Sequence, residues 1–234
     1  KTILDRFINY YVRKLIPFSD IYYDGQIVRN KEELLNQLLN DQTNMPVSKV
    51  LNRISNIILS NIEERKINRL SKIQAIVEAN SKHSFNIEHR SNQIARLEIN
   101  PIKRQIDEFL NIDFLSIYKL LFSNKDLFFR LSYGISLPDN ICDIIRFTKN
   151  ELNNKFITYS DSAPVAYLKL KFTGDYSYPN IRHLVVDEAQ DYYPLQYELI
   201  KLVFPNSSFT ILGDYNQSLE TEANDSIYDD IKAI

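Results

Sequence analysis

The chain has 234 residues, a net charge of −2 and 44% hydrophobic residues, values typical of a globular protein long enough to bury a core. It has no run of 18 apolar residues and its N-terminal segment is charged, so neither a transmembrane helix nor a signal peptide is expected. The single cysteine, Cys142, excludes an internal disulfide and predicts a cytoplasmic protein. The three histidines (His83, His89 and His183) show no metal-site spacing with it, so structural or surface roles are expected for all four.

The first two-thirds of the chain is predicted to be helical. Residues 3–16 have helical spacing that stops at Pro17, and 22–28 have the turn-then-extended pattern of a short irregular link. A second helix is expected over 30–40, because Asn30 is a good N-cap and acidic residues fill the first turn.

A long amphipathic helix is expected from Pro46 onward. Apolar residues recur there every three or four positions: Val47, Leu51, Ile54, Ile58, Ile62, Leu70, Ile73 and Val77. Thirty residues of helix extend about 45 Å, which is typical of a bundle, a hairpin arm or a segment that reaches a partner. The polar residues 81–92 are expected to break the helical pattern. It resumes over 102–122, in one helix or two, and a further helix is expected to start near Pro138.

The pattern changes after about residue 160. Residues 160–172 are expected to form a helix with Pro164 in its first turn. The short apolar run 183–187 predicts a strand buried on both faces, 193–204 predicts a helix, and 207–214 a second strand. A strand, a helix and a strand within about thirty residues indicate a βαβ unit with parallel strands.

Charge is distributed unevenly. Residues 1–155 carry 23 basic and 18 acidic residues, whereas 156–234 carry 5 and 12. Within the first part, residues 49–104 hold 11 basic and 5 acidic residues. A polyanionic partner and a solvated helical face both explain this basic segment.

Both predicted strands end in polar residues. Asp187, Glu188, Gln190 and Asp191 follow the first strand, and the second runs into Gly-Asp-Tyr-Asn-Gln-Ser at 213–218. Acidic clusters after strands are common in ordinary loops. However, the carboxyl ends of neighbouring parallel strands meet at one edge, where ligands of open α/β sheets bind. The pair of clusters therefore favours a nucleotide site.

Residue types suggest roles within such a site. A carboxylate at a strand end is held rigidly, so Asp187 is expected to bind Mg²⁺ directly or through water. Glu188 is expected to orient and deprotonate the attacking water as a general base. Gly213 allows a close backbone approach, and the Gln217 amide can contact a phosphate or that water. Gln217 would thereby report whether the γ-phosphate is present.

The segments "VVDEAQD" and "LGDYNQSL" resemble motifs II (Walker B) and III of superfamily 1 helicases of the UvrD/Rep class. Their surroundings, "APVAYLKLKF", "YPNIRHLVVDEAQDYYPLQYELIKLVFP" and "FTILGDYNQSL", are similar to the HelD-like branch, ATPases that act on bacterial RNA polymerase. The link "IVRNKEELLNQLLNDQTNMPVSKVLNRI" shows a weaker similarity. The strong resemblance covers about residues 160–220.

The resemblance implies an α/β fold: part of a RecA-like (P-loop NTPase) parallel sheet over 159–234, with a large α-helical insertion over 1–158. It implies ATP and Mg²⁺ as cofactors, with Gln190, Gly213 and Asp214 at the cofactor. The implied partners are DNA or bacterial RNA polymerase. Tyr215 and the pair Tyr192-Tyr193 are expected either to pack at the sheet edge or to contact nucleic acid or neighbouring domains.

The chain contains no G-x-x-x-x-G-K-[ST] phosphate loop. It is therefore expected to be a fragment of a longer ATP-dependent motor, inactive by itself. That motor would translocate on nucleic acid or remodel RNA polymerase. The alternative from another class is a helical protein- or nucleic-acid-binding module on a catalytically dead ATPase remnant.

Overall fold

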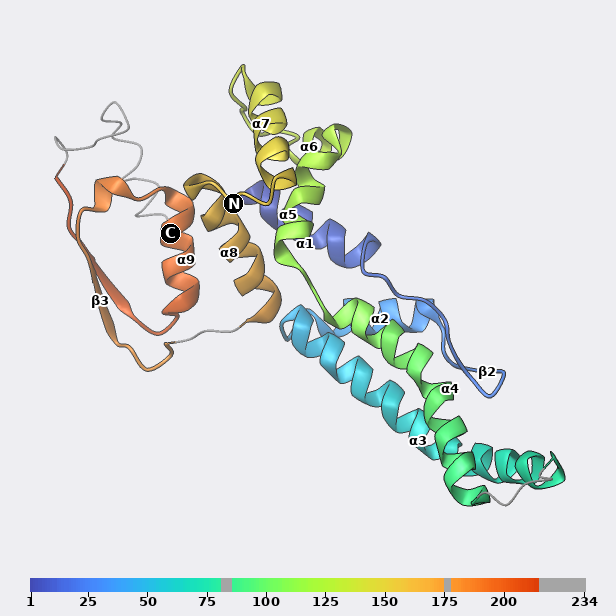
Figure 1. Ribbon diagram of the computed structural model, residues 1–234. Coiled ribbons are helices and arrows are strands. Elements are labelled where there is room, and N and C mark those ends of the chain that lie inside the picture. The colour runs from blue at the N-terminus through green and yellow to red at the C-terminus, as the bar shows by residue number, and fades with distance from the viewer. Residues whose placement is uncertain (81–85, 175–177, 215–234) are drawn as a thin grey trace. The chain divides into compact units, whose positions relative to one another are not determined.

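The computed structural model describes residues 1–80, 86–174 and 178–214 (Figure 1). The fold is α/β, mostly helical with two small sheets. The chain packs into two compact units: unit 1 consists of Lys1–Ile8 with Asp113–Ile234, and unit 2 of Asn9–Ile112. In the described ranges, every helix is too short or too polar to cross a membrane. These two units are defined by how the backbone packs. The boundary predicted at residue 158 was based on the sequence motifs instead, and it stays a prediction.

Helix α1 (Thr2–Lys14) begins in unit 1 and ends in unit 2, shortly before Pro17 as the sequence predicts. Helix α2 (Lys31–Asp41) confirms the helix expected over 30–40. The side chain of Asn30 accepts a hydrogen bond from the backbone N–H of Glu33 at 2.8 Å, and the Glu33 side chain accepts one from the Asn30 N–H. This capping box satisfies two donors that the first turn leaves unpaired.

Helix α3 (Val47–Asn80) confirms the long amphipathic helix and runs for 34 residues. Seven members of the predicted apolar stripe are buried: Val47, Leu51, Ile54, Ile58, Ile62, Ile73 and Val77. Each fully buried aliphatic side chain of this kind stabilises the fold by about 1.5–3 kcal/mol. Helix α4 (Ile87–Leu110) lies alongside α3, so the two helices form a hairpin (Figure 1), in which Ile73 and Val77 pack against Ala95 of α4.

The start of α4 differs from the prediction. The sequence pattern favoured a polar break over 81–92 and helical periodicity only from 102, but the helix begins at Ile87 with Asn86 as its N-cap. Pro101 lies inside the helix, where it removes one backbone hydrogen bond at a cost of about 3 kcal/mol. Burial of the apolar stripe Ala95, Ile99, Ile102, Ile106 and Phe109 offsets that cost; Ala95 packs against Ile73 and Val77 of α3, and Phe109 against Phe18.

The predicted irregular link over 22–28 is instead a β-hairpin. Strands β1 (Ile21–Tyr23) and β2 (Gln26–Arg29) pair antiparallel around Asp24 and Gly25. Both turn residues have positive φ, 51° and 72°. An Asp-Gly pair accepts this conformation more readily than most dipeptides, and the resulting turn matches the twist of the strands.

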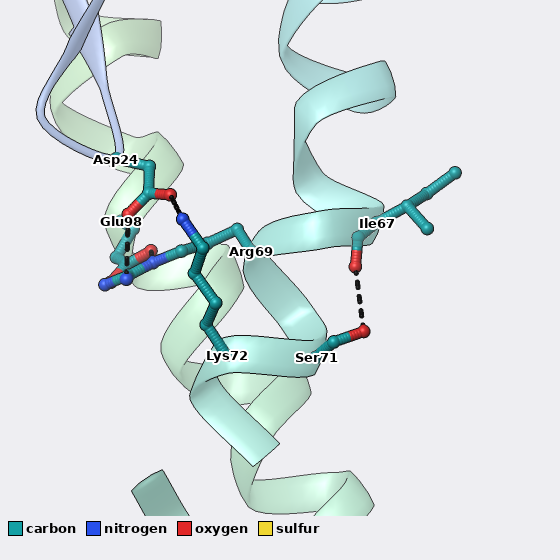
Figure 2. A network of polar contacts seen from close by, with 6 residues as sticks. All are labelled: Asp24, Ile67, Arg69, Ser71, Lys72 and Glu98. Atoms are coloured by element: carbon teal, nitrogen blue, oxygen red, sulfur yellow. Dashed lines mark hydrogen bonds and ion pairs between the residues drawn. The ribbon is translucent and has the colours of Figure 1, made fainter. Parts of the chain in front are cut away.

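Arg69 of α3 connects that turn to the helical hairpin (Figure 2). Its Nε donates to Oε2 of Glu98 on α4 at 2.9 Å, and its Nη1 donates to Oδ1 of Asp24 at 2.9 Å. Lys72, one turn further along α3, donates to Oδ2 of Asp24 at 2.6 Å. The Lys72 hydrogen bond, helped by the charge of Arg69, holds the pKa of Asp24 below its usual value.

Unit 1 is built mainly from helices. Four helices lie between residues 114 and 173: α5 (Phe114–Ser123), α6 (Lys125–Leu131), α7 (Ile141–Asn153) and α8 (Tyr159–Thr173). The residues 102–122 therefore form two helical pieces, the end of α4 and most of α5. Helix α7 begins close to the start expected near Pro138.

Helix α8 starts slightly earlier than the sequence suggested. Its N-cap is Thr158, and Pro164 lies inside the helix, past the first turn where it was predicted. The Thr158 hydroxyl donates to Oδ2 of Asp161 at 2.6 Å, and the Tyr118 hydroxyl of α5 donates to Oδ1 at 2.8 Å. Burial, followed by the negative charge of Asp161, raises the pKa of Tyr118. This buried polar contact joins α5 to α8.

The remainder of unit 1 confirms the predicted βαβ order. Strand β3 (His183–Val186) pairs parallel with β4 (Ser208–Ile211), and helix α9 (Pro194–Val203) lies between them in the sequence with Pro194 at its first position. The prediction that the first strand is buried on both faces is wrong for the described chain. Val186 is buried, but Val185 is 57% exposed, because only one neighbouring strand and one packed face are present among the described residues.

Candidate functional site

The carboxyl ends of β3 and β4 lie side by side, and their pairing continues into the segments that follow. Leu212 donates its backbone N–H to the Val186 carbonyl at 2.8 Å, and Ala189 donates to the Leu212 carbonyl at 2.9 Å. Backbone hydrogen bonds therefore join the start of the first predicted polar cluster to the residue that precedes the second, which is described as far as Asp214.

Asp187 and Glu188 occupy the first of these segments, and both are exposed. Glu188 has φ 52° and ψ 45°, a left-handed conformation that is uncommon for residues other than glycine. Its backbone N–H donates to Oδ1 of Asp187 at 2.9 Å. Such strained backbone costs about 1–3 kcal/mol and is concentrated at functional sites.

A short 3₁₀ turn, η1 (Ala189–Asp191), follows and rests on α9. Ala189 is fully buried together with Val186 and Tyr197. The hydroxyl of Tyr197 donates to the Ala189 carbonyl at 2.8 Å, which holds the turn against the helix. Tyr192 packs edge-on against the Tyr197 ring.

Gln190 connects the two polar segments. Its Nε2 donates to Oε2 of Glu188 at 2.7 Å, and its Oε1 accepts from the backbone N–H of Asp214 at 3.1 Å. Gly213 lies directly beneath this bridge. A Cβ at Gly213 would come within 2.8 Å of Gln190 Oε1 and 3.0 Å of Ala189 Cβ, so a larger residue would displace the Gln190 amide and crowd Ala189.

The structure thus places five of the six predicted site residues at one edge: Asp187, Glu188, Gln190, Gly213 and Asp214. The sixth, Gln217, lies outside the described residues, as does Tyr215. Tyr192 packs against α9, whereas Tyr193 is 45% exposed. Sequence reasoning missed the support that Tyr197 gives to Ala189; the helical spacing after Pro194 was the signal that could have placed Tyr197 beneath the turn.

The donor set at this edge is made of oxygen ligands. Within the described ranges, no group of three or more histidine, cysteine or acidic side chains forms a ready-made metal cluster. Mg²⁺ is usually bound through one or two carboxylates, with substrate phosphates and waters supplying the other ligands. An exposed carboxylate at a strand end, such as Asp187, fits that mode of binding. The described histidines and the cysteine lie elsewhere: Cys142 and His89 are exposed on α7 and α4, and His183 is at the start of β3, whereas His83 is outside the described residues.

The fold is α/β, with polar residues gathered at one edge of a parallel strand pair, and a comparison with family models assigns its class. The chain belongs to the UvrD/REP helicase N-terminal domain family, whose model matches residues 18–219. A search of curated proteins found no match. The family assignment indicates a superfamily 1 helicase-like, ATP-dependent motor that binds nucleic acid.

Proposed function

We propose that the chain forms part of the first RecA-like ATPase domain of a superfamily 1 motor, over 159–234, with an α-helical insertion over 1–158. ATP hydrolysis by the full-length protein drives movement on nucleic acid or remodelling of a bound partner. The chain alone does not hydrolyse ATP, since it contains no phosphate loop.

The residues at the strand edge have distinct roles in this proposal. Asp187 holds Mg²⁺, which supplies charge neutralisation on the ATP phosphates. Glu188 is the general base, and Gln217 couples the phosphate state to movement. Gln190, Gly213 and Asp214 form the wall of the nucleotide site next to them.

The observation that carries the proposal is the fit between the two motif segments. A Cβ at Gly213 would displace the Gln190 amide and crowd Ala189, and backbone hydrogen bonds join Leu212 to both Val186 and Ala189. Such close packing of two segments, each with a carboxylate at the same edge of the sheet, is expected of one shared site rather than of two unrelated loops.

The exposed apolar residues of the small sheet support its being part of a larger one. Val185 is 57% exposed, and Phe209 and Ile211 are each 36% exposed. Parallel sheets in α/β proteins are covered on both faces. Additional strands and helices of a complete RecA-like domain would bury these side chains.

The decisive experiment compares two glutamate variants of the full-length protein. Glu188→Gln should lower kcat for Mg²⁺-dependent ATP hydrolysis by about 10²- to 10⁴-fold, because a positioned general base contributes that much. Glu151→Gln, the same substitution on α7, should leave kcat unchanged. Full activity of Glu188→Gln, or Mg²⁺-dependent turnover by the chain alone that Glu188→Gln abolishes, would contradict the proposal.

The finer proposal is a HelD-like ATPase that acts on bacterial RNA polymerase, supported by the sequence surrounding the two motifs. The test is binding of the full-length protein to core RNA polymerase, with an unrelated acidic protein as the control. Binding no tighter than the control, together with unwinding of a tailed DNA duplex, would reject the polymerase assignment in favour of a nucleic-acid translocase.

The basic segment 49–104 offers a second test of the partner. Among its described residues, four cations are engaged in ion pairs: Arg53, Lys66, Arg69 and Lys72. If the segment binds DNA electrostatically, affinity should fall by orders of magnitude between 50 and 200 mM salt. A flat response would indicate a protein partner or a solvated helical face.

The rival proposal is a helical binding module on a dead ATPase remnant. It predicts that the full-length protein binds its partner but fails to turn over ATP under any condition. The acidic residues of both segments weigh against it, since a remnant has no need of Asp187 and Glu188 in this arrangement.

A further inference from the structure

We propose that Gln190 is a positioning residue for the general base: its side-chain amide holds the Glu188 carboxylate in an orientation set by the backbone at Asp214. The inference rests on the proposed function, because it assigns a role within the same hydrolytic site. If Gln190 has this role, the orientation of the Glu188 carboxylate depends on the position of Asp214, in the segment that follows β4.

The amide of Gln190 is engaged at both ends. Nε2 donates to Oε2 of Glu188 at 2.7 Å, and Oε1 accepts from the Asp214 N–H at 3.1 Å. These partners also fix which way the amide points. A carboxylate only accepts and a backbone N–H only donates, so a flipped amide would set oxygen against oxygen and N–H against N–H.

The bridge occupies one oxygen of the Glu188 carboxylate and leaves the other open. Within the described part of the chain, no donor lies within hydrogen-bond distance of Oε1 of Glu188, whereas Oε2 accepts from Gln190. A general base needs an oxygen within hydrogen-bond reach of the water that it deprotonates. Holding Oε2 therefore orients Oε1 without blocking it.

The surrounding residues are suited to glutamine at this position. The buried Ala189, held by Tyr197, fixes the backbone from which the amide extends. Gly213 provides the space for Oε1, since a Cβ there would lie 2.8 Å from it. Asparagine is one methylene shorter and cannot reach both partners, and glutamate would place a second carboxylate against Glu188.

The test replaces Gln190 by methionine in the full-length protein, which keeps the side-chain length and removes both hydrogen bonds. We expect kcat for ATP hydrolysis to fall about 10- to 100-fold while KM for ATP changes less than twofold. A raised KM with kcat preserved would show that Gln190 binds the nucleotide rather than positions the base. Unchanged kcat and KM would also overturn the inference.

Gln196→Met is the matched control. The amide of Gln196 also makes two hydrogen bonds, accepting from the Tyr193 N–H at 2.7 Å and donating to the Tyr159 hydroxyl at 3.1 Å, but it touches neither carboxylate. Both variants should lose a similar amount of thermal stability. Only Gln190→Met should lose kcat; an equal loss of kcat in both variants would reduce Gln190 to a structural role.

A double variant separates this inference from the proposed function. If Gln190 acts through the base, Gln190→Met should lower kcat no further when Glu188→Gln is already present, because residues that act as a unit are not additive. An additive loss would contradict the positioning role. Full activity of Glu188→Gln would instead reject the proposed function itself, whereas an inactive Glu188→Gln with a fully active Gln190→Met would reject the positioning role alone.

Discussion

The hydroxyl of Tyr118 donates to Oδ1 of Asp161 at 2.8 Å, in the buried contact between α5 and α8. Hydrogen bonds to charged groups contribute about 1.5–3 kcal/mol, and removing one partner leaves the other undersatisfied. Tyr118→Phe should therefore lower the free energy of unfolding by about that amount in a urea titration. Tyr133→Phe is the control, because Tyr133 is 83% exposed, and it should change stability by less than about 0.5 kcal/mol. Equal effects would contradict the buried contact.

Arg69 should matter more than the other cations of α3. Its guanidinium contacts both Glu98 and Asp24, so Arg69→Met removes the connection between the β-hairpin turn and the helical hairpin. We expect a loss of about 1 kcal/mol in the free energy of unfolding and faster amide exchange in β1 and β2. Lys66→Met, which removes an i, i+3 pair with Glu63, should leave exchange in these strands unchanged. Identical exchange rates in both variants would contradict this role.

Acidification should weaken the same network. The pKa of Asp24 is lowered in the folded state by its Lys72 hydrogen bond, so its ionised form stabilises the fold. This contribution is fully present above the unfolded pKa of about 3.9 and disappears as pH falls through the lower folded value. Asp24→Asn, which tolerates the positive φ, should remove that part of the pH dependence when stability is titrated from pH 6 downward. An unchanged titration would contradict the assignment.

Lys155 offers a stabilising substitution. It follows the last residues of α7 with φ 60°, and the Phe156 N–H reaches back to the Glu151 carbonyl at 3.0 Å. Helices commonly end in this way with glycine at the left-handed position. Lys155→Gly should raise the melting temperature and add about 1 kcal/mol to stability. Lys149→Gly, inside α7, should instead lower stability by about 1 kcal/mol. A lower melting temperature for Lys155→Gly would contradict the expectation.

The sequence was most informative where one spacing repeats over many residues. The stripe from Val47 to Val77 predicted α3 because seven of its eight members are buried, as one apolar face of an amphipathic helix would be. Helix α4 was partly missed because the polar residues 81–92, whose second half begins the helix, were read as a break. The first part of α4 is stabilised by packing on α3, and local helix propensity does not predict such tertiary contacts. The hairpin around Asp24 was read as irregular although its Asp-Gly signal was present.

The strand ends that carry Asp187 and Glu188 followed from apolar runs that stop abruptly. Two details of the site had no sequence signal. Glutamate rarely adopts a left-handed backbone, so nothing predicted it at Glu188. The contact of Gln190 with Asp214 joins positions 24 residues apart, and it depends on the register of β3 with β4, which spacing alone does not define.

Gly213 has a consequence for how this protein can vary. Every amino-acid change reached by a single-base substitution in a glycine codon introduces a Cβ, and at this position that atom meets Gln190 and Ala189 within 3.0 Å. Random mutagenesis of the full-length protein, followed by selection for the proposed ATPase function, should therefore recover amino-acid changes at codon 213 less often than at other exposed positions such as Tyr133. The two segments can vary in sequence around it, but every amino-acid change at the point where they touch requires Gln190 or Ala189 to move.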